Sequence, residues 1–236
     1  MQGIILAAGR GSRIHHLTNG LPKSFLELGG KKLIERNVDM LRDHGIEDII
    51  IVTGYRKDAF ESLFAGQRGI RLVFNPFYEF ANVIGSYWMG MNYLHDDFVY
   101  FHADTICEKA LFEDLLECDG DIVLPVEAGA VDDEAMKVRL DAGRRVVEIT
   151  KNMPVEQAAG EFIGIAKLRK NVIPLLNQKA TELMAEKAFD EYFEAAIQRV
   201  LDEGKFSTVI MPTDGKFWAE IDFEEDYRRA ERLIKD

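Results

Sequence analysis

The sequence is poor in cysteine, in proline and in long apolar runs. Its 236 residues include 2 cysteines and 6 prolines, and Cys107 and Cys118 have neither a second cysteine pair nor a histidine at zinc-ligand spacing. A disulfide scaffold and a structural zinc site are therefore excluded, and a reducing compartment, the cytoplasm, is the expected location. The apolar run at residues 4–8 is too short for a signal peptide, and nothing approaches the roughly 20 apolar residues of a membrane span.

Basic residues are also outnumbered. There are 29 Lys and Arg against 41 Asp and Glu, which gives a net charge of −12. Nucleic acid and anionic membranes require a basic protein face, so we expect neither as a partner. A small anionic substrate remains compatible with this composition if a few basic side chains gather in one cleft.

What the first half does contain is an alternation of short apolar strands with amphipathic helical patterns. Strands are predicted at residues 3–8, 49–53, 71–74 and 98–101. Leu33, Ile34, Val38 and Leu41 mark one face of the first helix, and Gly45 is its stop signal. Strands that alternate with helices imply βαβ crossovers and a mostly parallel sheet.

The middle of the chain changes character. Residues 137–140 and 146–150 bracket an Asp-Ala-Gly turn, as in a β-hairpin. Further strands are predicted at residues 121–126, 161–168, 207–211 and 218–222, and helices near residues 171–186 and 190–203, before a charged terminal helix. No repeat or break in composition marks a linker. We therefore expect one α/β domain over residues 1–236, with a mixed, mostly parallel sheet flanked by helices.

The strongest local signal is the opening segment LAAGRGSR at residues 6–13, followed by Pro22 and Lys23. A strand that runs into a Gly-x-Gly turn exposes backbone N–H groups to phosphate oxygens. A Rossmann fingerprint would need glycine where Ile14 stands, and a P-loop would need Gly-Lys-Ser/Thr after its first glycines. What remains is a glycine turn with two cations, Arg13 and Lys23. Alone, the turn could also be a tight turn with solvated basic residues.

This constellation resembles the nucleotidylyltransferase family, which has the Rossmann-like nucleotide-diphospho-sugar-transferase fold and the signature L-A-A-G-x-G-x-R…P-K. Every fixed position is present between Leu6 and Lys23. Within the family the chain is most similar to the phosphocholine, 2-aminoethylphosphonate and inositol-phosphate cytidylyltransferases, and the segments ITKN (residues 149–152) and GEFIGI (residues 160–165) favour the first two. The resemblance implies an enzyme that transfers CMP from CTP to a small phosphorylated or phosphonate alcohol or amine and releases diphosphate.

Two aspartates are candidate metal ligands. Asp104 follows the strand at residues 98–101, at the edge where open α/β sheets bind ligands. Asp222 ends the segment WAEID. Taken alone, either could cap the helix that follows it. The resemblance implies instead that both hold Mg²⁺, a hard cation that takes one or two carboxylates plus substrate phosphates.

The same resemblance suggests roles for the cations. Arg13 should steady the β- and γ-phosphates, and Lys23 the α-phosphate, where charge develops during an in-line displacement. Lys151 is a candidate cation for the acceptor's phosphate, although it could equally be an exposed lysine at a strand end. The nucleotide is expected against Leu6, Ala7, Ala8, Gly9, Gly11, Ser12, Gly54, Asn82, Gly85 and Ser86, the last three in the loop after the third strand.

The acceptor pocket is the part that the sequence determines least. An acceptor with an ammonium group needs aromatic faces and a carboxylate, because a cation over an aromatic ring gains about 0.5–2 kcal/mol. The candidates are Tyr192, Trp218, Glu191 and Glu194, and the two glutamates share one face of a predicted helix. The alternative is that the aromatic residues belong to the core and that the glutamates lie on a solvent-exposed acidic face. The 5 histidines form no ligand motif, so we expect none of them in the site.

Two other functions remain open. A sugar-1-phosphate or inositol-phosphate nucleotidylyltransferase would share the opening motif. A non-catalytic nucleotide-sensing scaffold on the same fold is expected to lose a charged anchor, whereas Arg13, Lys23, Asp104 and Asp222 are all present. The expected partners are CTP and a small phosphorylated acceptor. A homodimer is compatible with the sequence, which does not decide the oligomeric state.

Overall fold

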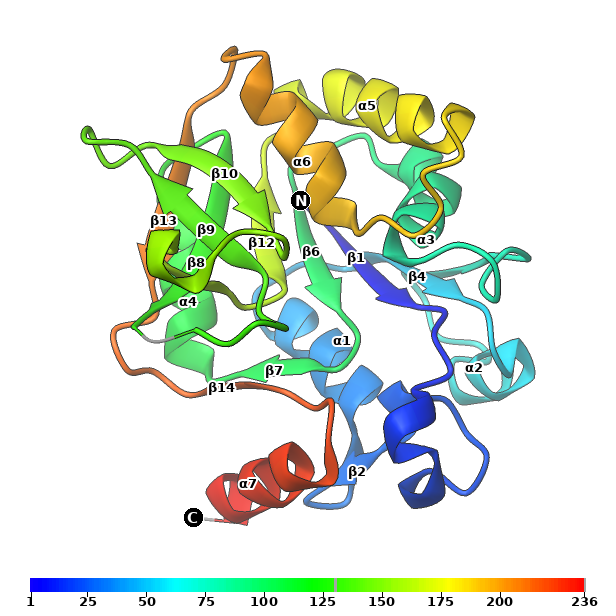
Figure 1. Cartoon of the computed structure of the whole chain (residues 1–236). Helices are drawn as coiled ribbons and strands as arrows, with labels where there is room; N and C mark the ends of the chain where they lie inside the picture. Colours follow the sequence, from blue (N-terminus) through cyan, green and yellow to red (C-terminus); the bar gives the residue numbers. More distant parts are fainter. Residues whose placement is uncertain (130, 236) are drawn as a thin grey trace.

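A central sheet with helices on both faces organises the computed structural model, which describes residues 1–129 and 131–235 (Figure 1). Its strands are β1 (Gln2–Ala7), β4 (Asp48–Thr53), β5 (Ile70–Phe74), β6 (Phe98–His102), β8 (Ile122–Ala128), β9 (Lys137–Leu140), β10 (Val146–Thr150), β11 (Gly160–Phe162), β12 (Ile165–Leu168) and β13 (Thr208–Pro212). They follow the order β10-β9-β11-β8-β12-β6-β1-β4-β5, and β13 pairs with β8 outside this path.

The helices divide between the two faces of this sheet. One face carries α1 (Leu33–Asp43), α2 (Lys57–Leu63) and α4 (Lys109–Glu117), and the other carries α3 (Val83–Gly90), α5 (Ile173–Ala185) and α6 (Phe193–Asp202). Successive side chains of a strand point to opposite faces, so Ile4 and Leu6 pack in one core while Ile5 and Ala7 pack in the other. Burial on both faces explains why these strands read as continuous apolar runs.

The first half of the sheet is parallel and the second half is mixed. β1 pairs in parallel with β4 and β6, and β4 pairs in parallel with β5. β12 runs antiparallel to both β6 and β8, whereas β13 is parallel to β8. β9 and β10 form the predicted antiparallel hairpin. The predicted fold class, a mixed and mostly parallel sheet between helices, is confirmed.

The strand predicted over residues 161–168 is wrong as a single element. It is two strands, β11 and β12, which pair with different neighbours: β11 with β8 and β9, and β12 with β6 and β8. The chain turns between them at Gly164, whose φ of +77° is a conformation that favours glycine. The apolar pattern continues across the turn because both strands are buried, so periodicity alone could not reveal the break.

Shorter elements complete the edge of the sheet at which β1 and β6 end. The segment after β1 forms the short helices η1 (Ser12–Leu17) and η2 (Lys23–Phe25), and a small hairpin joins β2 (Glu27–Leu28) to β3 (Lys31–Lys32). Strand β7 (Thr105–Cys107), which the sequence pattern does not predict, pairs antiparallel with β14 (Trp218–Glu220). Helix α7 (Glu224–Lys235) follows. None of the helices in the described part of the chain is long and apolar enough to cross a membrane.

The topology fixes where a ligand can bind. From β1 the chain passes to β4 and β5 on one side, and then crosses to β6 on the other side of β1 (Figure 1). At such a switch point the loops after the two neighbouring strands diverge and leave a crevice at their carboxyl ends. The β7–β14 pair brings the C-terminal part of the chain to this same edge.

Candidate active site

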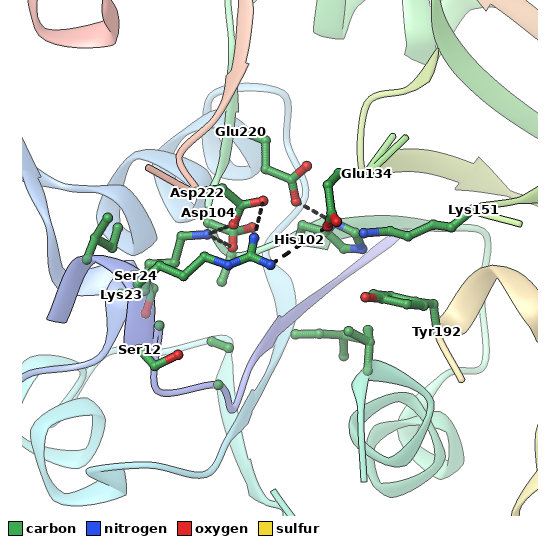
Figure 2. Close-up of a pocket in the computed structure, with 18 residues that line it drawn as sticks. Ser12, Lys23, Ser24, His102, Asp104, Glu134, Lys151, Tyr192, Glu220 and Asp222 are labelled. Carbon is green, nitrogen blue, oxygen red and sulfur yellow. Dashed lines mark hydrogen bonds and ion pairs between the residues drawn. The ribbon is translucent and has the colours of Figure 1, made fainter. Parts of the chain in front are cut away.

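A cavity of about 400 Å³ lies at the carboxyl ends of β1 and β6 (Figure 2). Eleven of the residues predicted for the site line it: Leu6, Ala7, Gly9, Gly11, Ser12, Arg13, Lys23, Asp104, Lys151, Tyr192 and Asp222. They come from segments that are more than 200 positions apart in the sequence. The structure therefore brings the predicted cations, both predicted metal ligands and the glycine turn into one place.

The glycine turn needs glycine at position 11 for its backbone conformation and for the close approach of Lys23. Gly11 has a φ of +68°, and a Cβ atom at this position would lie 2.4 Å from the Cβ of Lys23. Only glycine therefore allows the lysine to pass against the turn. At Gly9 no heavy atom of the described residues would lie within 4 Å of an added Cβ. The backbone at Gly9 is thus open to the cavity, as an approaching phosphate would require.

Lys23 lies between the two aspartates. Its Nζ is 2.7 Å from Oδ2 of Asp104 and 2.5 Å from Oδ1 of Asp222, and the residue is only 8% exposed. Burial by itself lowers the pKa of Lys23, but the two carboxylates more than offset this and raise the pKa above its ordinary value. The ammonium group is thus held in its charged form. Burial raises the pKa of Asp104, but the charges of Lys23 and then His102 outweigh burial, so that this pKa is lowered.

The capping alternatives for the two aspartates are contradicted. The N-cap of α4 is Glu108, and not Asp104. Asp222 directs its carboxylate to Lys23, whereas the N–H groups of Asp222 and Phe223 both donate to Asp226. Pairing of β7 with β14 explains why residues 104 and 222 meet, since it places Glu220 opposite Thr105. Carboxylates that converge on one cation also form a donor set suited to Mg²⁺, so the residues present fit this ion.

Arg13 and Lys151 stand at the mouth of the cavity. The Arg13 guanidinium is half-exposed and lies 4.0 Å from Asp222 and 3.7 Å from Glu134. The Lys151 ammonium lies 4.5 Å from the centre of the Tyr192 ring, in a cation–π contact. Both cations are exposed enough to be redirected toward an anionic ligand.

The expectation that no histidine belongs to the site is wrong. His102, the last residue of β6, lines the cavity, with Nε2 at 3.4 Å from Glu194 and Nδ1 at 3.4 Å from Glu220. Burial lowers the pKa of His102, but the two carboxylates dominate and raise it well above the ordinary value. The signal that could have revealed this residue was its position, because it ends a central parallel strand two residues before Asp104.

Two of the predicted acceptor residues, Glu191 and Glu194, line a further cavity of about 950 Å³ together with Lys151 and Tyr192, but not in the arrangement that was expected. Glu191 and Glu194 do not share a helix face, because α6 begins at Phe193 with Tyr192 as its N-cap, and Glu191 precedes the helix. Glu194 is 1% exposed behind His102, whereas Glu191 is exposed. The helix prediction began too early, and it therefore extended the helical periodicity to a residue in the preceding loop.

Trp218 belongs to a neighbouring cavity of about 470 Å³. The two cavities share His102, Glu134, Lys151, Tyr192, Glu220 and Asp222. The indole N–H of Trp218 donates to Glu127, and Glu161 is a further carboxylate of the same wall. Burial, followed by the charge of Glu220, raises the pKa of Glu161 to about 7. The second cavity thus adjoins the first and is mainly acidic and aromatic.

Five residues predicted to hold the nucleotide lie outside the described lining of the first cavity: Ala8, Gly54, Asn82, Gly85 and Ser86. At Gly54 a Cβ would lie 2.7 Å from the carbonyl oxygen of Ala8, so this glycine lets the end of β4 approach the glycine turn. Asn82 caps α3 by accepting from the N–H of Val83. Gly85 and Ser86 lie in the first turns of α3, and not in a loop as predicted.

The chain is similar to known nucleotidyltransferases. Residues 3–204 match the model of the MobA-like NTP transferase domain. The chain is 31% identical, over 98% of its length and 51% of the relative's, to the bifunctional IPC transferase and DIPP synthase of Rubrobacter xylanophilus. It is 38% identical to the choline-phosphate cytidylyltransferase of Streptococcus pneumoniae over 48% of each protein. The chain thus spans about half the length of these curated relatives.

Solved structures agree. The CTP:phosphocholine cytidylyltransferase LicC from Streptococcus pneumoniae superposes with a TM-score of 0.80 at 25% identity, over 99% of this chain and 98% of that one. The inositol-1-phosphate CTP transferase from T. maritima has a TM-score of 0.78 at 23% identity, which shows the shared fold alone. With the family model matched over residues 3–204, the chain belongs to the MobA-like NTP transferase domain family, as the resemblance to nucleotidylyltransferases implied.

Proposed function

We propose that the protein is a Mg²⁺-dependent cytidylyltransferase that transfers CMP from CTP to a small phosphorylated or phosphonate alcohol or amine, with release of diphosphate. The observation that carries this proposal is the convergence of Lys23, Asp104 and Asp222 beside an open glycine turn. Similarity to a choline-phosphate cytidylyltransferase over about half of the chain supports CTP as the donor.

The reaction is an in-line displacement at the α-phosphorus of CTP. An oxygen of the acceptor's phosphate or phosphonate forms the new P–O bond, and the bond to the diphosphate leaving group breaks, so no side-chain nucleophile is required. Positioning and charge stabilisation then provide the rate enhancement. Lys23 is suited to the α-phosphate because it is buried and its charge is maintained by two carboxylates. Arg13, half-exposed at the mouth, is suited to the β- and γ-phosphates.

Asp104 and Asp222 would hold Mg²⁺ in this proposal. When bound, the ion neutralises part of the triphosphate charge, which a protein with a net charge of −12 needs in order to accept a polyphosphate. The backbone N–H groups around Gly9 add donors for the phosphate oxygens. The chain's own contribution is therefore a set of fixed charges that orient the triphosphate with its leaving group toward Arg13.

We assign the acceptor to the second cavity. Lys151 stands between the two cavities and can hold the acceptor's phosphate next to the α-phosphorus. Tyr192 and Trp218 offer aromatic faces, and Glu161 offers a carboxylate, so an ammonium group fits this wall. We therefore favour 2-aminoethylphosphonate or phosphocholine as the acceptor. Of the residues predicted for it, Tyr192 and Trp218 are retained, Glu194 acts through His102, and Glu191 has no role in the proposal.

Diphosphate release with defined substrates tests the proposal. CTP, UTP and dTTP are each combined with 2-aminoethylphosphonate, phosphocholine, inositol-1-phosphate and glucose-1-phosphate at fixed Mg²⁺. We expect turnover with CTP and an amine-bearing acceptor. Turnover of UTP or dTTP with glucose-1-phosphate alone would identify a sugar-1-phosphate enzyme. No diphosphate from any pair would favour a non-catalytic nucleotide-sensing scaffold.

An inositol-phosphate cytidylyltransferase is the second candidate. It is supported by the relative from Rubrobacter xylanophilus, an IPC transferase and DIPP synthase that matches 98% of this chain. A cyclitol has neutral hydroxyl groups, and these can donate hydrogen bonds to carboxylates such as Glu161 and Glu127. Turnover of inositol-1-phosphate with CTP, and of neither amine, would establish this alternative.

A further inference from the structure

Lys137, the first residue of β9, is a lysine whose charged end is buried inside the protein. It is 1% exposed and lies outside the described lining of the three cavities at the site. Its Nζ donates to the carbonyl oxygens of Asp133 at 2.9 Å, Ala135 at 3.2 Å and Lys151 at 2.9 Å. A lysine ammonium has three N–H donors, so all of them are used by the backbone.

The three acceptor carbonyls belong to two irregular segments of the chain. Residues 133–135 lie in the loop between β8 and β9, and residue 151 lies in the turn after β10. Outside helices and strands, a carbonyl removed from water needs another donor. The loop is also braced internally, because Oδ1 of Asp132 accepts from the N–H groups of Glu134 and Ala135. The Lys137 ammonium therefore joins a braced loop to a separate turn.

Both segments carry side chains that reach the cavity. Glu134 and Lys151 line it from these two segments (Figure 2). Glu134 lies between the two loop carbonyls that Lys137 binds, and its carboxylate is 3.7 Å from Arg13. The Lys151 ammonium stands over the Tyr192 ring, while the carbonyl of Lys151 accepts from Lys137. Lys137 thus fixes the backbone from which a cation and a carboxylate of the site project.

We propose that Lys137 is a positioning residue for the acceptor's phosphate, because it holds the turn at Lys151 against the 133–135 loop and so sets where the Lys151 ammonium stands. An apolar residue could fill the same buried space, but it would leave three carbonyls without a donor. A misplacement of about 1 Å at a charged group can cost about 100-fold in activity. This inference rests on the proposed function, in which Lys151 binds the acceptor's phosphate.

Steady-state kinetics of Lys137→Met tests the positioning role, because methionine keeps the length of the side chain and lacks the ammonium. We expect the KM for the acceptor to rise about 10–100-fold and the KM for CTP to stay within about threefold. A role in stability alone would lower the fraction of folded enzyme, and so kcat, without changing either KM. Two unchanged KM values would therefore overturn the proposal. Lys109→Met, at an exposed lysine of α4, is the control.

A double-mutant cycle tests whether Lys137 acts through Lys151. In a Lys151→Ala background, Lys137→Met should raise the KM for the acceptor by less than about threefold, because the cation that it positions is already gone. The same rise in both backgrounds would contradict the proposal. Lys137→Gln keeps two N–H donors of shorter reach, which favours folding, and it should show the same split between the two KM values at about 3–10-fold.

Nuclear magnetic resonance of isotope-labelled lysine separates failure of this proposal from failure of the proposed function, because it needs no turnover. The Lys151 side chain over the Tyr192 ring should give an upfield-shifted signal, which Lys151→Arg assigns. In Lys137→Met and Lys137→Gln this signal should move toward that of an exposed lysine, while Lys57 over the Phe74 ring keeps its own shift. An unchanged Lys151 signal in either folded variant would overturn the proposal, whatever the transferase activity.

Discussion

The two walls of the cavity pair are built in different ways. The wall proposed to bind the nucleotide, called the nucleotide wall and formed by residues 6–13 with Lys23, comes from one strand and the turns that follow it. The wall proposed to bind the acceptor, called the acceptor wall, consists of four residues from separate elements. They are Lys151 just after β10, Glu161 in β11, Tyr192 at the start of α6 and Trp218 in β14. A continuous segment can be recognised as a motif, whereas a wall assembled from separate elements leaves no such pattern in the sequence.

The walls also differ in their charge. On the nucleotide wall each buried charge has an opposite partner, as Lys23 has in Asp104 and Asp222. On the acceptor wall carboxylates face one another, and burial together with Glu220 raises the pKa of Glu161 to about 7. In the proposed function the first wall would stabilise developing negative charge. On the second wall the pKa of Glu161 stays raised although Lys151 lies nearby, so a further positive group would favour its charged form.

The sharpest difference is expected at Lys23, the central cation of the nucleotide wall. Lys23→Ala should lower kcat by about 10²–10³-fold, because a buried charge at the α-phosphate acts mainly in the transition state. The KM for CTP should stay within about threefold. Steady-state kinetics measures both constants. Lys109→Ala, which removes an exposed lysine on α4, is the control. A rise in KM with an unchanged kcat would contradict the assigned role.

The paired aspartates come next. Asp104→Asn and Asp222→Asn should each reduce activity about 100-fold, because each removes a carboxylate from the Lys23 cluster and from the proposed metal site. Wild-type activity should also disappear in excess EDTA and return with added Mg²⁺. Asp119→Asn, at an aspartate that is 97% exposed, should behave as wild type. Full activity in EDTA would remove Mg²⁺ from the mechanism.

The comparison also explains what could be predicted from the sequence. The opening motif predicted a segment that lines the cavity, and the alternation of strands and helices predicted the parallel half of the sheet, because both signals are local. His102 and Glu220 were missed, since their association depends on β6 lying near β14 rather than on spacing. Glu191 and Glu194 were expected on one helix face because the helix was predicted to begin near residue 190. The helix begins at Phe193, with Tyr192 as its N-cap, so Glu191 lies outside it.

The stability of the protein should depend on the turn at Gly164, which lies against His102. Gly164→Ala forces an alanine into a φ of +77° and places its Cβ 2.7 Å from Nδ1 of His102, so we expect a loss of about 2–3 kcal/mol in the free energy of unfolding. Gly204→Ala has a similar φ of +62° with no heavy atom of the described residues within 4 Å, and should cost about 1 kcal/mol. Denaturant unfolding measures both. Equal losses would mean that backbone strain alone matters at Gly164.

The smallest effect should appear at Glu161, as a dependence of stability on pH. Burial and Glu220 raise its pKa from 4.5 to about 7, so the folded state binds this proton more tightly than the unfolded state does. The resulting stabilisation is complete below about pH 4.5 and is lost as the pH rises through about 7. Because Glu161 is only partly buried and water screens it, we expect the loss to amount to about 1–2 kcal/mol.

Glu161→Gln isolates this contribution, because glutamine keeps the shape and cannot ionise. Unfolding by denaturant at about pH 5 and about pH 8 should show that the wild type loses about 1–2 kcal/mol more than the variant does between these values. Glu156→Gln, at an exposed glutamate in the short helix η4 (Val155–Gln157) before β11, should keep the wild-type dependence. If Glu161→Gln also kept it, the acceptor wall would carry no unbalanced charge there, and an ammonium acceptor would lose its electrostatic reason to bind.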